Sequence, residues 1–488
     1  MTRSSRWSAL TVAALLAGGC ITLEPQYERP VAPIAGEWPI PPITPESKAT
    51  PDSATPAAIA GHEGAAVADV GWRDFLVDER LESVVALALE NNRDLRIAVL
   101  NAERSRALWG IRRADRVPSV GGAVSAVRQR LPESQSGTGR AETFTSYSAE
   151  VGVTSYELDL FGRVRSLSRA ALEQFFASEE ARRSAQIALI GEVATTWLSL
   201  AADLELQRLA EETVGVQEES FRLTERRHEL GAVSGLEVSQ ARTTVESARV
   251  DAARFAGNVA QDLNLLTLLV GAPVPAELLP GGFDDDVTGL APLPSGLPSE
   301  VLLRRPDVLA AEHFLRAANA NVGAARAAYF PRIGLTGAAG VSSGELSSLL
   351  EGGSVGWSFI PQVTIPIFQG GRLRAGRQVA EAERAIAVAD YESTIQAGFR
   401  EVADALSLTA TLFRQREAQE ALAAAARRAY ELSQARHESG RDSYLVLLDS
   451  QRAWYTAQQG LIVTRLAEQA NRVALYRVLG GGWEEGNG

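Results

Sequence analysis

The chain has one cysteine, Cys20, among its 488 residues, so a disulfide within the chain is impossible. A metal-binding or catalytic cysteine would likewise lack a cysteine partner. Histidine is also scarce, with four residues that form no cluster in the sequence. No zinc-ligand spacing, phosphate-binding loop or nucleophile-elbow motif occurs. The sequence therefore predicts no metal site and no enzyme activity.

The chain also has fewer positively charged than negatively charged residues. The formal net charge is -12 and no basic cluster is present, which argues against nucleic acid as a partner. Aromatic residues make up only 6% of the chain, and small and helix-forming residues are abundant, a composition typical of long helices. The acidic run Asp284–Asp286 lacks the other ligands of a calcium loop and is interpreted as a solvated turn.

Long apolar runs are not evident beyond the N-terminus, so the sequence predicts no transmembrane helix. Such a chain can cross a bilayer only as a closed β-barrel, because the hydrocarbon offers no partners to unpaired backbone groups. Residues 1–19 have the features of a secretory signal: Arg3 and Arg6 precede a short apolar stretch, and small residues precede Cys20.

Residues Leu16–Cys20 resemble a bacterial lipobox, in which the cysteine receives a covalent lipid and becomes the new N-terminus. The pattern departs from the usual one in having Ala17 where leucine is expected. An ordinary signal peptide with a chance cysteine is the alternative. Because the only cysteine occupies this position, we interpret Cys20 as lipidated. Ile21, in place of an aspartate after the cysteine, favours the outer membrane.

One stretch of the chain occurs twice. Residues 162–231 align without a gap on residues 371–440 at a shift of 209 positions, and both copies begin Gly-Arg-x-Arg and end Arg-His-Glu-x-Gly. Neither copy contains proline, which allows an unbroken helix of about 105 Å. A soluble domain does not need a helix of this length, so we interpret the length itself as a physical requirement.

Each half of the chain has the same expected order: a helix, two strands, a long helix, a turn and a return helix. In the first half these are a helix over 78–115 with a kink at Asn91–Asn92, strands over about 117–130 and 144–161, a long helix over 162–230 and a return helix over 236–270. In the second half they are a helix over 300–329, strands over about 332–342 and 354–367, a long helix over 370–438 and a return helix over 442–479. The domain division is a signal peptide (1–19), a lipid-anchored extended tether (20–70) that wraps or spaces the body, a first repeat (71–270), a linker (271–299), a second repeat (300–480) and a tail (481–488).

The four strands alternate apolar with small or polar residues and have the length that a tilted strand needs to cross a bilayer. Four strands cannot close a membrane barrel, so the chain must oligomerise if the strands span. A dimer would supply eight strands and a trimer twelve, the latter with room for a channel. Soluble hairpins packed on a helical core are the alternative.

Several motifs resemble those of the TolC/OprM family of outer-membrane efflux channels, in the right order over roughly residues 70–480. They are Leu158–Ser166 and Ile365–Arg372 at the strand-to-helix junctions, Leu303–Val308, and Tyr444–Arg452. The lipobox places the chain nearest the lipoprotein, OprM-like branch.

This resemblance implies a mainly α-helical chain with membrane strands. Three copies would form a twelve-stranded barrel in the outer membrane and a tube of twelve helices across the periplasm, with the linker and C-terminal segments in an equatorial belt. The implied function is a passive duct that carries drugs or other small molecules outward. The implied partners are a periplasmic adaptor (membrane fusion) protein, an inner-membrane pump, often of the RND type, and outer-membrane lipid.

The resemblance also implies roles for two groups of residues. The two helical turns would dock the adaptor: Gly231, Ala232, Val233, Ser234, Gly235 and Leu236 in one, Gly440 and Arg441 in the other. Leu445, Asp449 and Arg452 share one helix face and would line the closed periplasmic gate. Without the resemblance, these would be ordinary turns and a surface ion pair worth under about 1 kcal/mol.

Two further hypotheses stay open. His228 and His437 occupy equal places before the two turns, and an interaction with the helix dipole is favoured over a metal or pH role. A periplasmic coiled-coil structural or adaptor lipoprotein without a pore is the alternative function. It would explain the lipid and the hairpins, but it gives no reason for strands of bilayer length in both halves.

Overall fold

The computed structural model describes residues 22–36, 38–39, 70–137, 139–283, 290–291 and 299–481. Cys20, His62 and Asp284–Asp286 lie outside these residues. The chain divides into two compact units, each assembled from three segments. The strand unit combines the segment up to Val31 with Asn101–Glu179 and Ala310–Glu392, and the hairpin unit combines Ala32–Leu100 with Glu180–Leu309 and the segment from Ser393 onward.

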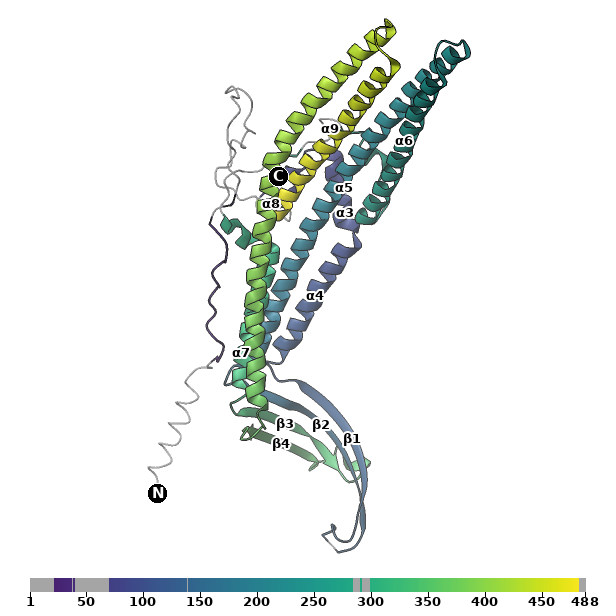
Figure 1. Cartoon of the computed structure of the whole chain (residues 1–488). Helices are drawn as coiled ribbons and strands as arrows, with labels where there is room; N and C mark the ends of the chain where they lie inside the picture. Colours follow the sequence, from purple (N-terminus) through teal and green to yellow (C-terminus); the bar gives the residue numbers. More distant parts are fainter. Residues whose placement is uncertain are drawn as a thin grey trace. The chain divides into compact units, whose positions relative to one another are not determined.

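Two long helices are the longest elements of the chain. Helix α5 covers Arg163–Glu229 and α8 covers Arg372–Glu438, 67 residues each. Both ends of α8 lie 209 positions after the ends of α5, as the sequence duplication predicts. Each helix is about 100 Å long. The return helices are α6, Gly235–Val270, and α9, Tyr444–Val478. In the hairpin unit the helices lie side by side in the order α8, α9, α5, α6 (Figure 1).

The first predicted helix is split at Asn92, where a kink was expected. Helix α3 covers Glu79–Asn91 and α4 covers Arg93–Ala114. The Asn92 side chain accepts a hydrogen bond from Leu95 N at 2.8 Å and donates one to Leu269 O at 2.7 Å. The asparagine therefore caps α4 and ties the joint to the end of α6. Gly271 ends α6 at φ 75°, and a side chain there would meet Asn91 O at 2.5 Å.

The predicted helix over 300–329 needs correction at its N-terminal end. The 3-10 turn η4 covers Ser299–Arg304, and the α-helix α7 begins only at Pro306 and ends at Ala327. Proline has no backbone N–H to donate, so it is well placed at the first position of a helix and poorly placed inside one. The helical periodicity before Pro306 is therefore real, but it belongs to a separate turn.

Four antiparallel strands form one sheet in the order β1-β2-β3-β4. They are β1 Val120–Leu131, β2 Glu142–Leu158, β3 Arg332–Ser343 and β4 Val355–Thr364. Each bound lies within three residues of the expected one. The β2–β3 register shifts between Val153 and Tyr156, around Ser155, which has a positive φ of 60°. Such a bulge bends the strand, and the sheet is visibly curved (Figure 1).

The register places apolar side chains on one face of all four strands. In one row across the sheet, Val124 lies opposite Ala149, Ala149 opposite Val341, and Val341 opposite Val355. The neighbouring row on the other face is polar and small, with Ser125 opposite Ser148. Both faces are open to solvent: β1 and β4 are exposed along nearly their whole length. The expected alternation is confirmed, and none of the described elements of the strand unit covers the apolar face.

The main hydrophobic core lies in the hairpin unit. It joins Trp72, α3, the middle of α5 and the end of α9, and it includes the fully buried Trp197. One 18-residue window of α5 reaches a mean hydropathy of 1.4, enough by length and composition to cross a membrane. However, 67% of that window is buried inside the protein. The expectation that no such run exists was therefore wrong, and the run forms core rather than a lipid-facing surface.

Residues 24–29 lie along α7 in the strand unit. Asn319 Nδ2 donates to Pro25 O at 2.8 Å, and both Tyr27 and Arg29 hydrogen-bond to Glu312. Burial of Glu312 opposes its ionisation, but hydrogen bonds from its arginine partners lower its pKa nevertheless. Because successive contacts step backward along α7, this N-terminal strap runs antiparallel to the helix.

Candidate functional site: the hairpin turns and the start of the return helix

The first hairpin turn, residues 230–234, ends α5 in a Schellman motif. Gly231 N donates to His228 O at 2.8 Å, and Ala232 N donates to Arg227 O at 2.8 Å. Gly231 has φ 74°, the left-handed conformation that this motif requires and that glycine adopts without strain. The side chain of Ser234 then caps α6 by accepting from Glu237 N at 3.3 Å. These paired backbone groups hold the turn in one conformation.

The second turn, residues 439–443, repeats this geometry. Gly440 has φ 71°, its N–H donates to His437 O at 2.9 Å, and Arg441 N donates to Arg436 O at 2.9 Å. Arg436 also forms a two-pronged ion pair with Asp442, at 2.6 and 2.8 Å. Hydrogen bonding to this guanidinium lowers the pKa of the Asp442 carboxyl. The sequence duplication did not predict this pair, because Val233 occupies the position in the first turn that is equivalent to Asp442.

The two histidines have one structural role in common. His228 Nδ1 lies 2.9 Å from Val233 O, and His437 Nδ1 lies 3.2 Å from Asp442 O. A carbonyl oxygen only accepts, so Nδ1 donates in both cases and the ring links the helix end to the far side of the turn. Among the described residues no group of three or more potential metal ligands occurs, so these histidines have no described partners for a metal.

The two turns differ in the side chains that they expose. Leu230 and Leu236 flank the first turn and are 79% and 67% exposed. Arg441 is exposed in the second turn. The two turns therefore present different side chains to solvent. The structure thus places the predicted docking residues at two exposed, hydrogen-bonded turns, and their docking role stays a prediction.

Leu445, Asp449 and Arg452 lie on the exposed face of the first turns of α9. The opposite face is packed, with Tyr444 and Leu448 in a buried cluster with Ala241 of α6. Within the part of the chain that the structure describes, Asp449 and Arg452 form no ion pair with each other. The three side chains therefore share a face as predicted, and their charged groups are available to a neighbouring chain. Their gate role stays a prediction.

The sequence did not reveal the contacts that two residues of this region make, although Tyr444 begins one of the family motifs. Tyr444 ties the hairpins together, because its hydroxyl lies 3.3 Å from Ser220 Oγ of α5 and its ring packs near His437. Arg436 fixes the second turn through Asp442. The signal for Tyr444 was present, since a large aromatic residue stands at the first position of a return helix. The Arg436–Asp442 pair bridges a turn whose backbone path the sequence does not specify.

Comparison with known proteins shows the family of the chain. The family model described as outer membrane efflux protein matches residues 84–272 and 297–481, which correspond to the two halves of the chain. Among curated relatives, a toluene efflux pump outer membrane protein of Pseudomonas putida, TtgC, is 46% identical over 480 residues, covering 98% of this chain and 96% of the relative. Outer membrane protein OprJ of Pseudomonas aeruginosa is 44% identical over 479 residues, with the same coverage.

The fold has a solved counterpart. The open-state structure of the Neisseria gonorrhoeae MtrE outer membrane channel superposes with a TM-score of 0.82 at 35% identity, covering 95% of this chain and 99% of that one. These matches favour a membrane conduit over an adaptor without a pore. The chain belongs to the outer membrane efflux protein family, and it is an outer-membrane transport protein rather than an enzyme.

Proposed function

We propose that this chain is the outer-membrane component of a tripartite efflux system: a passive homotrimeric duct for small molecules. An inner-membrane pump, of the RND type, would deliver the cargo, and a periplasmic adaptor would join the pump to the duct. Relatives named as toluene, solvent and antibiotic efflux pump outer membrane proteins support this proposal. The cargo class proposed from them is organic solvents and antibiotics.

The observation that carries the proposal is the uncovered four-stranded sheet. Its outer strands, β1 and β4, each have one edge without a partner strand among the described elements, and its apolar face lacks a described covering element. Trp357 and Phe359 on β4 are 81% and 62% exposed. An open edge is unstable in a bilayer, because each backbone group without a hydrogen-bond partner costs roughly several kcal/mol where no water is present. Pairing β4 of one copy with β1 of the next removes both edges, and three copies supply twelve strands.

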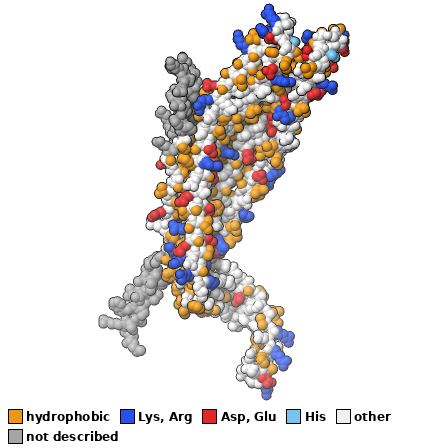
Figure 2. All heavy atoms as spheres, in the orientation of Figure 1, with side chains coloured by type: hydrophobic (Ala, Val, Ile, Leu, Met, Phe, Trp, Pro, Cys, Tyr) orange, Lys and Arg blue, Asp and Glu red, His pale blue; other side chains and the backbone are white. Residues whose placement is uncertain are grey.

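The helices support the same assembly. Helices α5, α6, α8 and α9 lie side by side as one layer in the hairpin unit (Figure 1), so three copies supply twelve helices. In the space-filling view, orange side chains are scattered over the visible surface of the hairpins (Figure 2). Exposed apolar residues such as Leu408 and Phe413 on α8 are available for contact with a second copy. A tube of about 100 Å, the length of α5, suits a duct across the space between two membranes.

The direction of the N-terminal strap supports a lipid on Cys20. Glu24 lies against Gly323, where a side chain would come within 2.8 Å of Glu24 Cα, and later strap residues contact earlier parts of α7. The start of the strap therefore points toward the end of α7 that leads into β3. Cys20 lies at most about 13 Å further along an extended chain. A lipid there would enter the same bilayer as the strands.

We assign to the two turns and to the start of α9 the docking and gate roles that the family resemblance implied. The two turns, with Leu230, Leu236 and Arg441 exposed, would dock the adaptor. Leu445, Asp449 and Arg452 would face the threefold axis, where three copies of each would narrow the opening. Opening would then require the α8–α9 hairpin to move outward.

The proposal is tested on full-length protein purified from outer membranes. Native mass spectrometry should give three chains per particle, and the same preparation should conduct ions in planar lipid bilayers. Expression in a strain whose own channel is deleted should restore resistance to exported compounds, provided that the cognate pump and adaptor are present. A monomeric particle that produces no current would overturn the proposal.

A further inference from the structure

The charged side chains of the four-stranded sheet are sorted between its two faces. The strand register places the acids of the described strands on the polar face: Glu142, Glu150 and Glu157. On the apolar face the described strands carry no acid and two cations, Arg128 and Arg130 of β1. Both arginines lie at the loop end of the sheet, the end opposite to the junctions with α5 and α8. This sorting leaves positive charge at one end of an otherwise apolar surface.

The charge of these two arginines is not neutralised within the described chain. Both side chains are exposed, and neither belongs to an ion pair among the described residues. The β1–β2 turn adds one acid, Glu133, and one cation, Arg140, so it does not offset the two arginines. Blue side chains gather toward this end of the sheet in the space-filling view (Figure 2). Two guanidinium groups on one strand face are therefore available to an anion from outside the chain.

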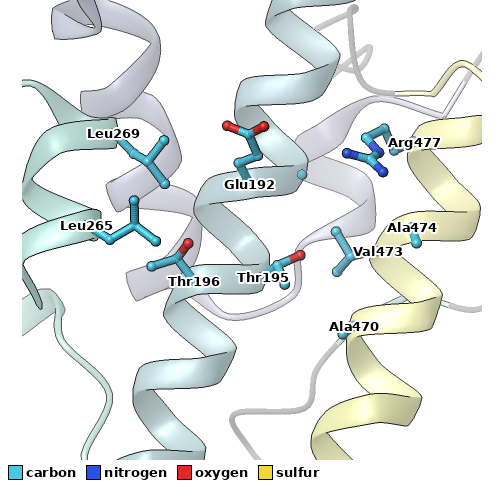
Figure 3. A pocket seen from close by; sticks show the side chains of 10 residues that line it. Glu192, Thr195, Thr196, Leu265, Leu269, Ala470, Val473, Ala474 and Arg477 are labelled. Atoms are coloured by element: carbon cyan, nitrogen blue, oxygen red, sulfur yellow. The ribbon is translucent and has the colours of Figure 1, made fainter. Parts of the chain in front are cut away.

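Other arginines of the chain are accompanied by acids. At the helix end of the sheet, Arg163 pairs with Glu157 at 2.6 Å. In the hairpin unit, the groove between α5, α6 and α9 is lined by both an acid, Glu192, and a cation, Arg477 (Figure 3). Groups of opposite sign in one groove favour neither an anion nor a cation. The loop end of the apolar face differs, because its charges have a single sign.

The arginines also lie at a definite height on the sheet. Apolar residues of this face extend along β3 from Ile333 to Val341, and Arg128 lies two rows beyond the row of Val341. At about 3.4 Å per residue, Arg128 is about 40 Å from Ile333 along the strands. A strand tilt of about 40° reduces this to about 30 Å along the membrane normal, whereas the apolar band of such barrels is about 25 Å tall. Arg128 therefore lies just beyond the hydrocarbon, at the level of the lipid headgroups.

An aromatic residue marks the same boundary. Tyr147 lies on the apolar face opposite Ala126, one row closer to the hydrocarbon than Arg128. Tyrosine is enriched at membrane–water interfaces, because its ring is apolar and its hydroxyl is polar. In the next row Arg128 lies opposite Thr145, whose hydroxyl is a further hydrogen-bond donor. The order apolar, aromatic, basic along this face matches the order of hydrocarbon, interface and phosphate in a bilayer leaflet.

We propose that Arg128 and Arg130 bind the phosphate group of an anionic lipid in the outer leaflet of the outer membrane. The proposal rests on the proposed function, because the loop end faces outward when the helices lie in the periplasm. A guanidinium group binds phosphate through two parallel N–H···O hydrogen bonds. The partner is a lipid rather than a soluble phosphate, because the apolar face begins directly beside the arginines. The acyl chains of this lipid lie against residues such as Val124 while its phosphate contacts the arginines.

The test measures lipid binding to the full-length trimer in detergent by native mass spectrometry. The probe is diphosphoryl lipid A, and the matched lipid is the same lipid A with both phosphates removed. Arg128→Gln combined with Arg130→Gln should raise the apparent Kd for diphosphoryl lipid A at least fivefold and leave the Kd for the matched lipid within twofold. Lysine at both positions should restore most of the affinity, because the positive charge remains.

Arg332→Gln is the control variant. It removes an exposed cation from the polar face of the same sheet, at its helix end, and should leave both Kd values within twofold. Diphosphoryl lipid A that binds the double glutamine variant as tightly as wild type would overturn the proposal. Equal loss of binding in Arg332→Gln would also overturn it, because the effect would then follow total charge rather than position.

Two further measurements on the same preparations separate this proposal from the proposed function. The mass of the particle reports the trimer, and current in planar bilayers reports the channel. A conducting wild-type trimer whose lipid binding ignores Arg128 and Arg130 contradicts only the lipid site. A wild-type particle that is monomeric and carries no current contradicts the proposed function, and with it the orientation on which the lipid site rests.

Discussion

The carboxyl pair Asp203–Asp262 is an unfavourable contact within the hairpin unit. The two acids face each other between α5 and α6. Asn258 donates a hydrogen bond to Asp203 at 3.5 Å. Burial and the charge of Asp203 raise the pKa of Asp262 from the ordinary 3.8 to about 6. A fold keeps such a pair only at a cost in stability.

The pair predicts a pH-dependent gain from Asp262→Asn. Between about pH 4 and pH 6 the folded chain holds a proton on Asp262 that the unfolded chain has lost, so the free energy of unfolding falls as pH rises through this window. At pH 7.5 the asparagine variant should be more stable by about 1 kcal/mol, a value reduced for solvent screening at a partly exposed site.

Thermal melts at pH 4 and pH 7.5 check this prediction. The gain from Asp262→Asn should be present at pH 7.5 and much smaller at pH 4, where the folded wild-type chain already carries the proton and a substantial fraction of the unfolded chains carries it too. The exposed Asp404→Asn on α8 is the control and should show no such dependence. An equal gain at both pH values would contradict the assigned titration.

At the scale of elements, the two hairpin turns are built alike from different side chains. Both use a left-handed glycine, a Schellman pair and a histidine that donates across the turn. Their exposed surfaces differ, with leucines on one and an arginine on the other. A shared backbone with different surfaces suits docking to two neighbouring sites on an adaptor.

Gly231 supplies a test of the turn. Gly231→Val should strain the left-handed position by about 1–2 kcal/mol and fray the last turn of α5, whereas Gly231→Asn should be tolerated because asparagine adopts this conformation more readily. Hydrogen exchange at Ala232 reports the fraying, and drug susceptibility of the complemented strain reports docking. We expect trimers in both variants and reduced efflux only in Gly231→Val. Full efflux with a frayed turn would separate the turn from docking.

The sequence predicted the elements well where one periodicity extended over many residues. The two long helices, the kink at Asn92 and the alternating strands follow from local pattern, and they are confirmed. The start of α7 was wrong because helical periodicity does not reveal that Pro306 occupies the first position of a helix. The apolar run in α5 was missed because charged residues occur within it. Tertiary packing nevertheless buries most of this run, including Trp197.

For the candidate site, the sequence predicted which residues share a helix face but not which contacts they make. Spacing alone placed Leu445, Asp449 and Arg452 on one face, and the structure shows that this face is exposed. The contacts that fix the region, such as Arg436 with Asp442 and Tyr444 with Ser220, join residues across a turn or between helices. Such contacts depend on side-chain directions in the folded chain, which a single sequence does not contain.

At the scale of the whole molecule, the exposed face of α9 can act as a gate only in an assembly of several chains. In one chain Leu445, Asp449 and Arg452 face solvent, and the gate hypothesis requires three copies of them near one axis. Replacing both Asp449 and Arg452 by alanine should raise single-channel conductance several-fold, because interchain contacts and side-chain bulk are lost together. Glu417→Ala on α8 is the control. Unchanged conductance in the double variant would remove these residues from the constriction.

The central claim is that β4 of one copy pairs with β1 of the next to close a twelve-stranded barrel. The direct measurement is disulfide cross-linking in outer membranes, with Ser125→Cys in β1 combined in turn with Gly356→Cys or Ser358→Cys in β4, which lie on the same face of the sheet. Paired strands bring such residues within about 4.4–6.8 Å between Cα atoms in at least one register. Oxidation should yield covalently closed trimers in one of the combinations, and the single-cysteine variants should yield none. Monomers throughout, in membranes where the protein is folded, would contradict the account.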